Sequence, residues 1–208
     1  KSRPQQDVDD SGDDEEDINQ LPYEEREKQI RLMKEHVDSA AAQRAYFNEK
    51  MKVSQSAIGF IHSERAYCIV ADFCQNLQLP HFGEEQPGET YYTCPLTVNC
   101  FGIVDCSTDH LTAYVYHEGD GKKGGNNVSS LLFKYCNDKG WLNHQQSGKE
   151  LTVFMDNCGG QNKNRMVIRT LSLYLVEKGY FERVEVVFLV AGHTKNPCET
   201  CIQEKSGL

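Results

Sequence analysis

The sequence lacks any apolar run long enough to cross a membrane, and its N-terminus shows no secretory signal. It also lacks internal repeats and any excess of basic residues, with 22 Lys and Arg against 31 Asp and Glu. These absences argue against a membrane protein, a repeat protein and a large stand-alone nucleic-acid-binding surface. Nine Cys, an odd number, without a secretory signal indicate reduced thiols in an intracellular protein.

The first 20 residues contain almost nothing that could form a core. The segment from Asp7 to Asp17 carries eight acidic residues and no basic one. Such a segment repels itself and stays solvated, so we expect residues 1–20 to be a disordered acidic tail. Without this tail the net charge of −9 becomes nearly neutral, which is compatible with an acidic nuclease site. Because the chain starts at Lys1 rather than Met, we expect a fragment of a longer protein.

A long polar helix is predicted over residues 21–60, with a thin apolar stripe at helical spacing. This helix could connect domains, lie on the domain or pair with a partner, which leaves a homo-oligomer open. Beyond it, apolar runs and alternating segments predict strands at 66–72, 97–106, 111–117, 151–155 and 184–190. Amphipathic patterns predict helices over about 127–140 and 161–178, each closed by a glycine.

The order of these elements predicts an α/β fold for residues 61–208. Three strands joined by short turns pair antiparallel, and the alternating helices and strands that follow favour parallel pairing. The result is a mixed five-stranded sheet flanked by helices and preceded by the long helix. This order matches the ribonuclease H fold, but a fold alone does not establish a function.

Two aspartates end apolar runs and point to metal chemistry. Asp72 ends the first predicted strand, and Asp156 ends the fourth. A carboxylate beside a buried strand is costly unless it is paired or binds a cation, and two of them would suit Mg²⁺ or Mn²⁺. Two such ions could activate a water or a 3′-hydroxyl for attack on a phosphodiester. The alternative is that each aspartate merely caps a turn or a helix.

Polar segments after the fourth and fifth strands supply further candidates. His193 would orient a water or a phosphate if it shares the edge of the sheet with the two aspartates. Two-metal sites usually need a third acid, and Glu199 is preferred over Glu204 because it lies closer to His193. The side chains expected to contact a nucleic-acid backbone are Asn162, Lys163, Arg165 and Lys195.

Four motifs in the sequence resemble a known family. They are DFCQNLQLPHFGEEQPGETYY from Asp72, FGIVDC from Phe101, DNCGGQNKNR from Asp156 and GHTKNPCE from Gly192. Over residues 65–199 they resemble a transposon-derived domain of unknown function related to DDE-type transposases with a ribonuclease H core. The resemblance implies metal-dependent DNA strand cleavage and transfer in the nucleus, without a small-molecule cofactor. It also implies that Asp72 and Asp156 are the first two acids of a catalytic triad.

One departure from the family opens an alternative. Where the family usually continues as Cys-Asp into a helix, this chain reads Cys198-Glu199 and stops at Leu208. Glu199 can replace the aspartate as a metal ligand, but the missing helix suggests a C-terminal truncation. A non-catalytic remnant of a mobile element is therefore one alternative, and a generic nuclease on the same fold is another. A zinc module is a third, with ligands Cys158, His193, Cys198 and Cys201.

Overall fold

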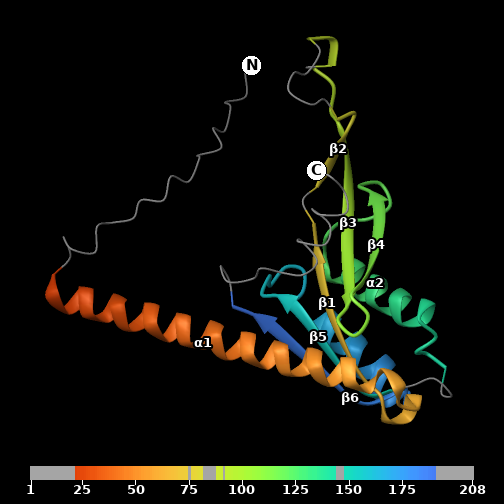
Figure 1. Ribbon diagram of the computed structural model, residues 1–208. Coiled ribbons are helices and arrows are strands. Elements are labelled where there is room, and N and C mark those ends of the chain that lie inside the picture. Colours follow the sequence, from red (N-terminus) through yellow and green to blue (C-terminus); the bar gives the residue numbers. More distant parts are fainter. Residues whose placement is uncertain (1–21, 75, 82–87, 91, 144–147, 191–208) are drawn as a thin grey trace. The chain divides into compact units, whose positions relative to one another are not determined.

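The computed structural model describes residues 22–74, 76–81, 88–90, 92–143 and 148–190 (Figure 1). Residues Lys1–Ser39 and Ala40–Leu208 form two separate compact units. The expected disordered tail over residues 1–20 lies outside the described residues. The second unit begins inside the long predicted helix rather than after it, because the helical residues beyond Ala40 pack on the sheet.

The described part of the first unit is the beginning of helix α1, which spans Tyr23–Ser56. Glu24 and Glu25 lie in its first turn, where acidic side chains favour the helix dipole. In this unit Ile30, Met33 and Val37 leave more than half of their surface exposed. No helix in the described ranges combines the length and apolarity that crossing a membrane requires.

The second unit is built on a mixed sheet of six strands, not the five that were predicted. The strands are β1 (Ala66–Phe73), β2 (Leu77–Leu79), β3 (Leu96–Asp105), β4 (His110–His117), β5 (Gly148–Asp156) and β6 (Phe181–Leu189). The extra strand, β2, lies between the first two predicted strands. All three of its side chains are exposed, so it has no apolar pattern and forms by backbone pairing with β3.

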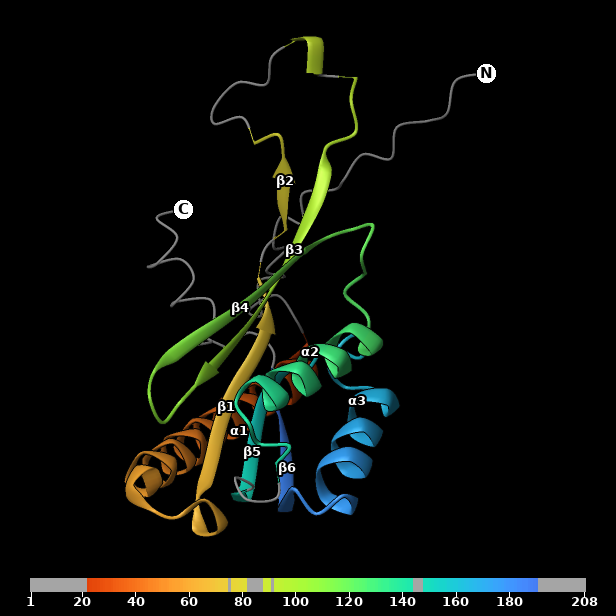
Figure 2. The ribbon, with the colours of Figure 1, turned by 90° about the vertical axis from the view of Figure 1, so that its right-hand side faces the viewer.

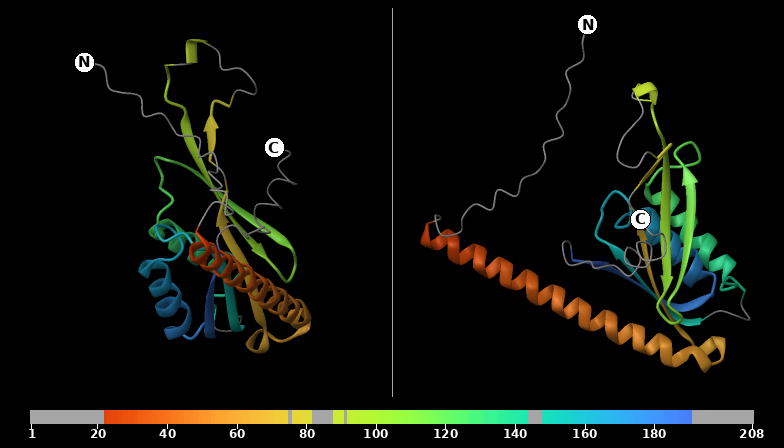
Figure 3. Two further views of the ribbon diagram at one scale, coloured as in Figure 1. Left: turned by 90° about the vertical axis from the view of Figure 1, so that its left-hand side faces the viewer. Right: turned by 45° about the horizontal axis from the view of Figure 1, so that its top comes forward.

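Strand β3 belongs to the antiparallel half of the sheet, which meets the parallel half at β1. It pairs antiparallel with β4 along one side, and with β1 and β2 along the other. Strand β1 pairs parallel with β5, which pairs parallel with β6. Because β2 pairs with the start of β3 and β1 pairs with its end, β2 continues along β3 beyond β1 (Figure 3).

Helices cover both faces of the sheet (Figure 2). Helices α2 (Gly125–Asp138) and α3 (Arg165–Thr170), with the π-helical turn η5 (Leu171–Glu177), pack on one face. Residues 40–56 of α1 cover the other face through Tyr46, Phe47 and Met51. The larger core lies under α2 and α3, and it includes Trp141, the single tryptophan, in contact with the rings of Tyr67, Tyr135 and Phe181.

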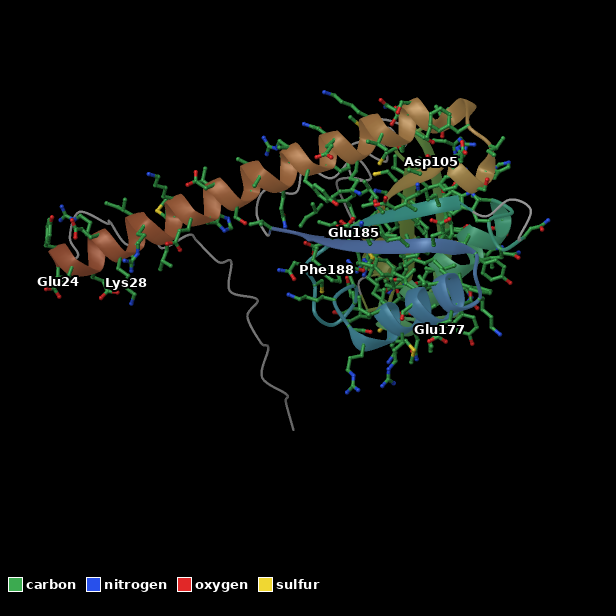
Figure 4. The ribbon with its side chains drawn as sticks, turned by 90° about the horizontal axis from the view of Figure 1, so that it is seen from below. Glu24, Lys28, Asp105, Glu177, Glu185 and Phe188 are labelled. Carbon is green, nitrogen blue, oxygen red and sulfur yellow. The ribbon has the colours of Figure 1, made fainter. Side chains whose placement is uncertain are left out.

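Polar contacts fix residues 40–56 of α1 on the sheet as well. The Lys50 ammonium lies 2.5 Å from Oε1 of Glu150 on β5 and 3.4 Å from Oε2 of Glu185 on β6. The Tyr46 hydroxyl donates a 2.8 Å hydrogen bond to the same Glu185 oxygen. Glu185 and Phe188 both lie on β6, Glu185 on the α1 face and Phe188 on the α3 face (Figure 4).

Short 3-10 turns connect the larger elements: η2 (Ala57–Gly59), η3 (His62–Glu64) and η4 (Gly88–Thr90). Helix α3 begins four residues later than the sequence pattern predicts, because the preceding loop folds back on Cys158 before Asn164 caps the helix. Gly140 and Gly179 follow their helices with φ of 73° and 74°, as expected for residues that end a helix. Asp109 in the β3–β4 turn has φ of 54°, a conformation that Asp and Asn tolerate.

Candidate functional site

The candidate site lies at the edge of the sheet where β1 and β5 end. These strands are parallel to each other and to β6, so their carboxyl ends meet at one edge. Strand β4 runs antiparallel to β3, as β1 does, so β4 ends toward this edge too. The segments that follow β1, β4 and β5 therefore emerge on one side of the sheet, where ligands of mixed α/β sheets commonly bind.

Asp72 and Asp156 lie side by side at this edge. The parallel register pairs Ala71 with Met155, and its next step sets Asp72 beside Asp156. Adjacent strands are about 4.8 Å apart, so the two backbones approach closely at this level. Their neighbours Val70 and Phe154 belong to the core under α1, and side chains alternate along a strand. The two carboxylates therefore leave the same face of the sheet.

The two aspartates have different neighbours on the flanking strands. On one side Asp72 is paired with Gly102 of β3, which has no side chain, and on the other side Asp156 is paired with Leu189 of β6. Both aspartates are half-buried, at the end of the core rather than within it. Oδ1 of Asp72 accepts a 2.7 Å hydrogen bond from the N–H of Phe73. This hydrogen bond is local, to the next residue of β1.

Two adjacent carboxylates are a hard-oxygen donor set of the kind that Mg²⁺ and Mn²⁺ prefer. In the described part of the chain, no three His, Cys, Asp or Glu side chains gather closely enough to hold a metal. The expected third acid Glu199, together with His193, Lys195, Cys198 and Cys201, lies outside the described residues. Of the four zinc ligands suggested by the sequence, the structure describes Cys158, whose thiol is half-buried.

The loop after Asp156 folds tightly around one carbonyl. The Cys158 carbonyl accepts hydrogen bonds from the N–H groups of Gln161, Asn162 and Lys163, at 3.2, 2.9 and 2.9 Å. Asn162 has no exposed surface, and within the described structure neither its Nδ2 nor its Oδ1 has a hydrogen-bond partner. In this conformation Asn162 does not offer its amide to a nucleic acid, contrary to the expectation from the sequence.

Lys163 and Arg165 line an open groove beside this loop. The groove has a volume of about 870 Å³ and is lined by Lys163, Asn164, Arg165, Met166, Ile168, Arg169 and Phe188. The Lys163 ammonium lies 5.9 Å from the centre of the Phe188 ring, a cation–π arrangement. Three cationic side chains around an apolar floor suit a chain of phosphates with stacking bases. Because Phe188 lies on the α3 face, the groove and the aspartates share an edge but lie on different faces.

Lys123 is a residue of this edge that the sequence reasoning missed. Its ammonium donates a 2.9 Å hydrogen bond to the carbonyl of Cys74, just after β1, and lies 5.1 Å from the centre of the Phe73 ring. The sequence shows only a flexible GDGKKGG loop. The signal that could have placed Lys123 is strand direction, because the loop follows β4, which ends on the same side as β1.

Comparison with known proteins gives a family but no activity. No curated protein and no solved structure matches this chain. A family described as a domain of unknown function (DUF7869) matches residues 90–200. The match includes Asp156, the groove, His193 and Glu199, and it begins after Asp72. Because it covers more than half of the 208 residues, the chain belongs to the family of domains of unknown function DUF7869.

Proposed function

We propose that the carboxyl edge of β1 and β5 is a divalent-metal site for the cleavage and transfer of DNA strands. The observation that carries this proposal is the position of Asp72 and Asp156, at one level and on one face of two adjacent parallel strands. The sequence motifs that resemble DDE-type transposases support the same assignment. So does the element order β1–β3–β4–α2–β5–α3–β6, which is that expected of a ribonuclease H-like fold.

In this proposal the side chains of the protein bind and position the reactants. Asp72 and Asp156 hold Mg²⁺ or Mn²⁺, and Glu199 is the proposed third ligand. Bound divalent ions supply Lewis-acid stabilisation of the charge that develops on the phosphate and the leaving oxygen. His193 is proposed to orient the attacking hydroxyl, and Lys195 to contact the backbone near the scissile phosphate. Gly102 of β3, which pairs with Asp72, adds no side chain next to it.

The basic groove supplies the binding surface. Lys163, Arg165 and Arg169 would neutralise phosphates of a bound strand, and Met166, Ile168 and Phe188 would contact its bases or sugars. Since the groove opens on the α3 face and the aspartates on the α1 face, a strand that contacts both must cross the edge of the sheet.

A nicking and strand-transfer assay tests this function directly. The full chain is incubated with supercoiled plasmid and with duplex oligonucleotides that carry terminal 3′-hydroxyls, with Mg²⁺, with Mn²⁺ or with a chelator. We expect metal-dependent nicking and joining that Asp156→Asn and Asp72→Asn abolish. Asp109→Asn is the matched control: it removes the same charge at the opposite end of the sheet, and asparagine tolerates the positive φ found there.

The groove favours a second candidate function, which the same assay separates from the first. A remnant that binds nucleic acid without cutting it would bind plasmid through the groove and leave it intact with every metal. Nicking without joining would point instead to a generic nuclease. Nicking that persists unchanged in Asp156→Asn would exclude this aspartate from the chemistry.

A further inference from the structure

Four cysteines lie in two facing pairs in strands β1 and β3 or just after their ends. The antiparallel register runs from Ile69 opposite Asp105 to Phe73 opposite Phe101. Extending this register by one residue at each end places Cys68 opposite Cys106 and Cys74 opposite Cys100. Backbone hydrogen bonds support both steps, from the N–H of Cys106 to the carbonyl of Cys68 and from the N–H of Cys74 to the carbonyl of Cys100, each at 2.9 Å.

The backbone geometry of both pairs suits a disulfide. Directly opposite residues in a hydrogen-bonded antiparallel pair have Cα atoms about 5.5 Å apart, and disulfides span Cα distances of about 4.4–6.8 Å. Opposite residues also send their side chains to the same face. No cysteine in the described ranges forms a disulfide, so both pairs are present as thiols.

The two pairs differ in their surroundings. Cys68 and Cys106 lie in the core under α1, with 1% and 6% of their surface exposed. Cys74 is half-buried, just after β1 where the strand leaves the core, and Cys100 opposite it is buried with 9% of its surface exposed. The Lys123 ammonium is hydrogen-bonded to the carbonyl of Cys74, so a positive charge lies next to the Cys74–Cys100 pair.

The same surroundings favour the thiolate of Cys100. The hydrogen bond with the Cys74 thiol is the main influence, and it lowers the pKa of Cys100 to about 7. Burial acts in the opposite direction, and the charge of Lys123 assists the lowering. Since the thiolate is the reactive form of cysteine, this lowering favours reaction at Cys100 over an ordinary thiol.

We propose that Cys74 and Cys100 are a site of reversible oxidation, at which a hydroperoxide converts the two thiols into a cross-strand disulfide. This inference goes beyond the proposed metal chemistry and does not depend on it. The disulfide would fasten the end of β1, which carries Asp72, to β3.

The reaction proceeds in two balanced steps. The Cys100 sulfur attacks a peroxide oxygen, the O–O bond breaks, and a sulfenic acid forms while the departing oxygen takes up a proton to leave as an alcohol or water. The Cys74 sulfur then attacks the sulfenic sulfur, the S–O bond breaks, and water leaves with the Cys74 proton. Two thiols and one hydroperoxide give one disulfide, one alcohol and one water. A dithiol reductant reverses the change by exchange.

The test is a peroxide titration of the folded full chain, read by mass spectrometry. After a short exposure to hydrogen peroxide, remaining thiols are alkylated and the unreduced protein is digested with chymotrypsin. Cleavage after Phe73, Leu77, Leu96 and Phe101 places the four paired cysteines on separate peptides. We expect the Cys74 and Cys100 peptides to become linked at least about tenfold faster than those of Cys68 and Cys106, and dithiothreitol to release them.

Matched variants make the assignment specific. In Cys74→Ser, Cys100 should stop at the sulfenic acid and react with dimedone, whereas Cys68→Ser should leave the Cys74–Cys100 link unchanged. A circular dichroism spectrum of each variant checks that it folds, and the titration of the wild-type chain does not depend on the variants. Faster linkage of Cys68 to Cys106, linkage of Cys100 to another cysteine, or no linkage before overoxidation would overturn the proposal.

Discussion

The side-chain carbonyl of Gln43 accepts a 2.7 Å hydrogen bond from the backbone N–H of Val190. The Nε2 atom of Gln43 also donates a 2.9 Å hydrogen bond to the carbonyl of Phe188. One amide side chain of α1 therefore pairs with the backbone of β6 much as a neighbouring strand would. Among the described residues β6 is the last strand on the path of the sheet, and these bonds occupy backbone groups at its edge.

Replacing Gln43 by Ala should loosen this edge. Gln43→Ala removes both hydrogen bonds, so we expect the free energy of unfolding to fall by about 1–2 kcal/mol and the Val190 amide to exchange faster with deuterium. Hydrogen exchange with mass spectrometry measures this protection. Asn48→Ala, at an exposed position of the same helix, is the control and should leave the protection of the Val190 amide unchanged. Unchanged exchange at Val190 in Gln43→Ala would mean that the contact does not hold the edge in solution.

The contacts of Lys50 with Glu150 and Glu185 predict that the stability of the fold depends on pH. Burial opposes ionisation of Glu185, but hydrogen bonding to Tyr46 and the charge of Lys50 outweigh it and hold the pKa of Glu185 below its ordinary value. The folded chain therefore binds the Glu185 proton less tightly than the unfolded chain. The stabilisation is complete above the unfolded pKa of about 4.3 and is lost as the pH falls through the lower folded pKa.

Glu185→Gln should remove this part of the pH dependence. We expect the variant to be about 1 kcal/mol less stable than wild type at pH 7, and the difference to shrink towards pH 3, because the Glu185 ion pair is lost as the pH falls through its lowered folded pKa. Urea unfolding at the two pH values measures it. Glu182→Gln, at an exposed position of the same strand, is the control. A difference that stays constant between pH 7 and pH 3 would contradict the ion-pair explanation.

The basic groove predicts a defined effect on nucleic-acid binding. If Arg165 and Arg169 each contact a phosphate, replacing either by Gln should weaken binding of all sequences alike. Each substitution should also reduce, by about 1, the slope of the logarithm of the binding constant plotted against the logarithm of the salt concentration. Fluorescence anisotropy over a range of salt concentrations measures the slope. Arg183→Gln is the control, because Arg183 lies on β6 outside the groove, and it should leave the slope unchanged. If wild type and the three variants all gave the same slope, the groove would not be the binding surface.

The main strands could be predicted because the residue pattern within each strand is sufficient to identify it. Continuous apolar runs mark β1 and β5, which are buried on both faces, and the alternation along β4 matches its one half-buried face. Strand β2 escaped prediction because a three-residue exposed strand depends on its partner's backbone and not on its own side chains. The start of α3 depends on bonds to the Cys158 carbonyl, which residue periodicity does not encode.

The candidate site could be predicted where it depends on strand ends. A carboxylate after each of two apolar runs was sufficient to propose Asp72 and Asp156 together, because parallel strands bring their carboxyl ends to one edge. Lys123 and the facing cysteines could not be found in this way, because their neighbours are set by the register between β1 and β3 and by the path of a loop. The burial of Asn162 likewise follows from tertiary packing and not from its polar sequence context.

The most direct test of the central claim is Mn²⁺ binding to the full chain, measured by electron paramagnetic resonance of the free ion. If Asp72 and Asp156 share a metal site, wild type should bind Mn²⁺, and Asp72→Asn and Asp156→Asn should each lose more than about tenfold in affinity. Asp109→Asn should bind as wild type does. Equal Mn²⁺ binding by wild type and Asp156→Asn, or no binding by wild type, would contradict a shared carboxylate site.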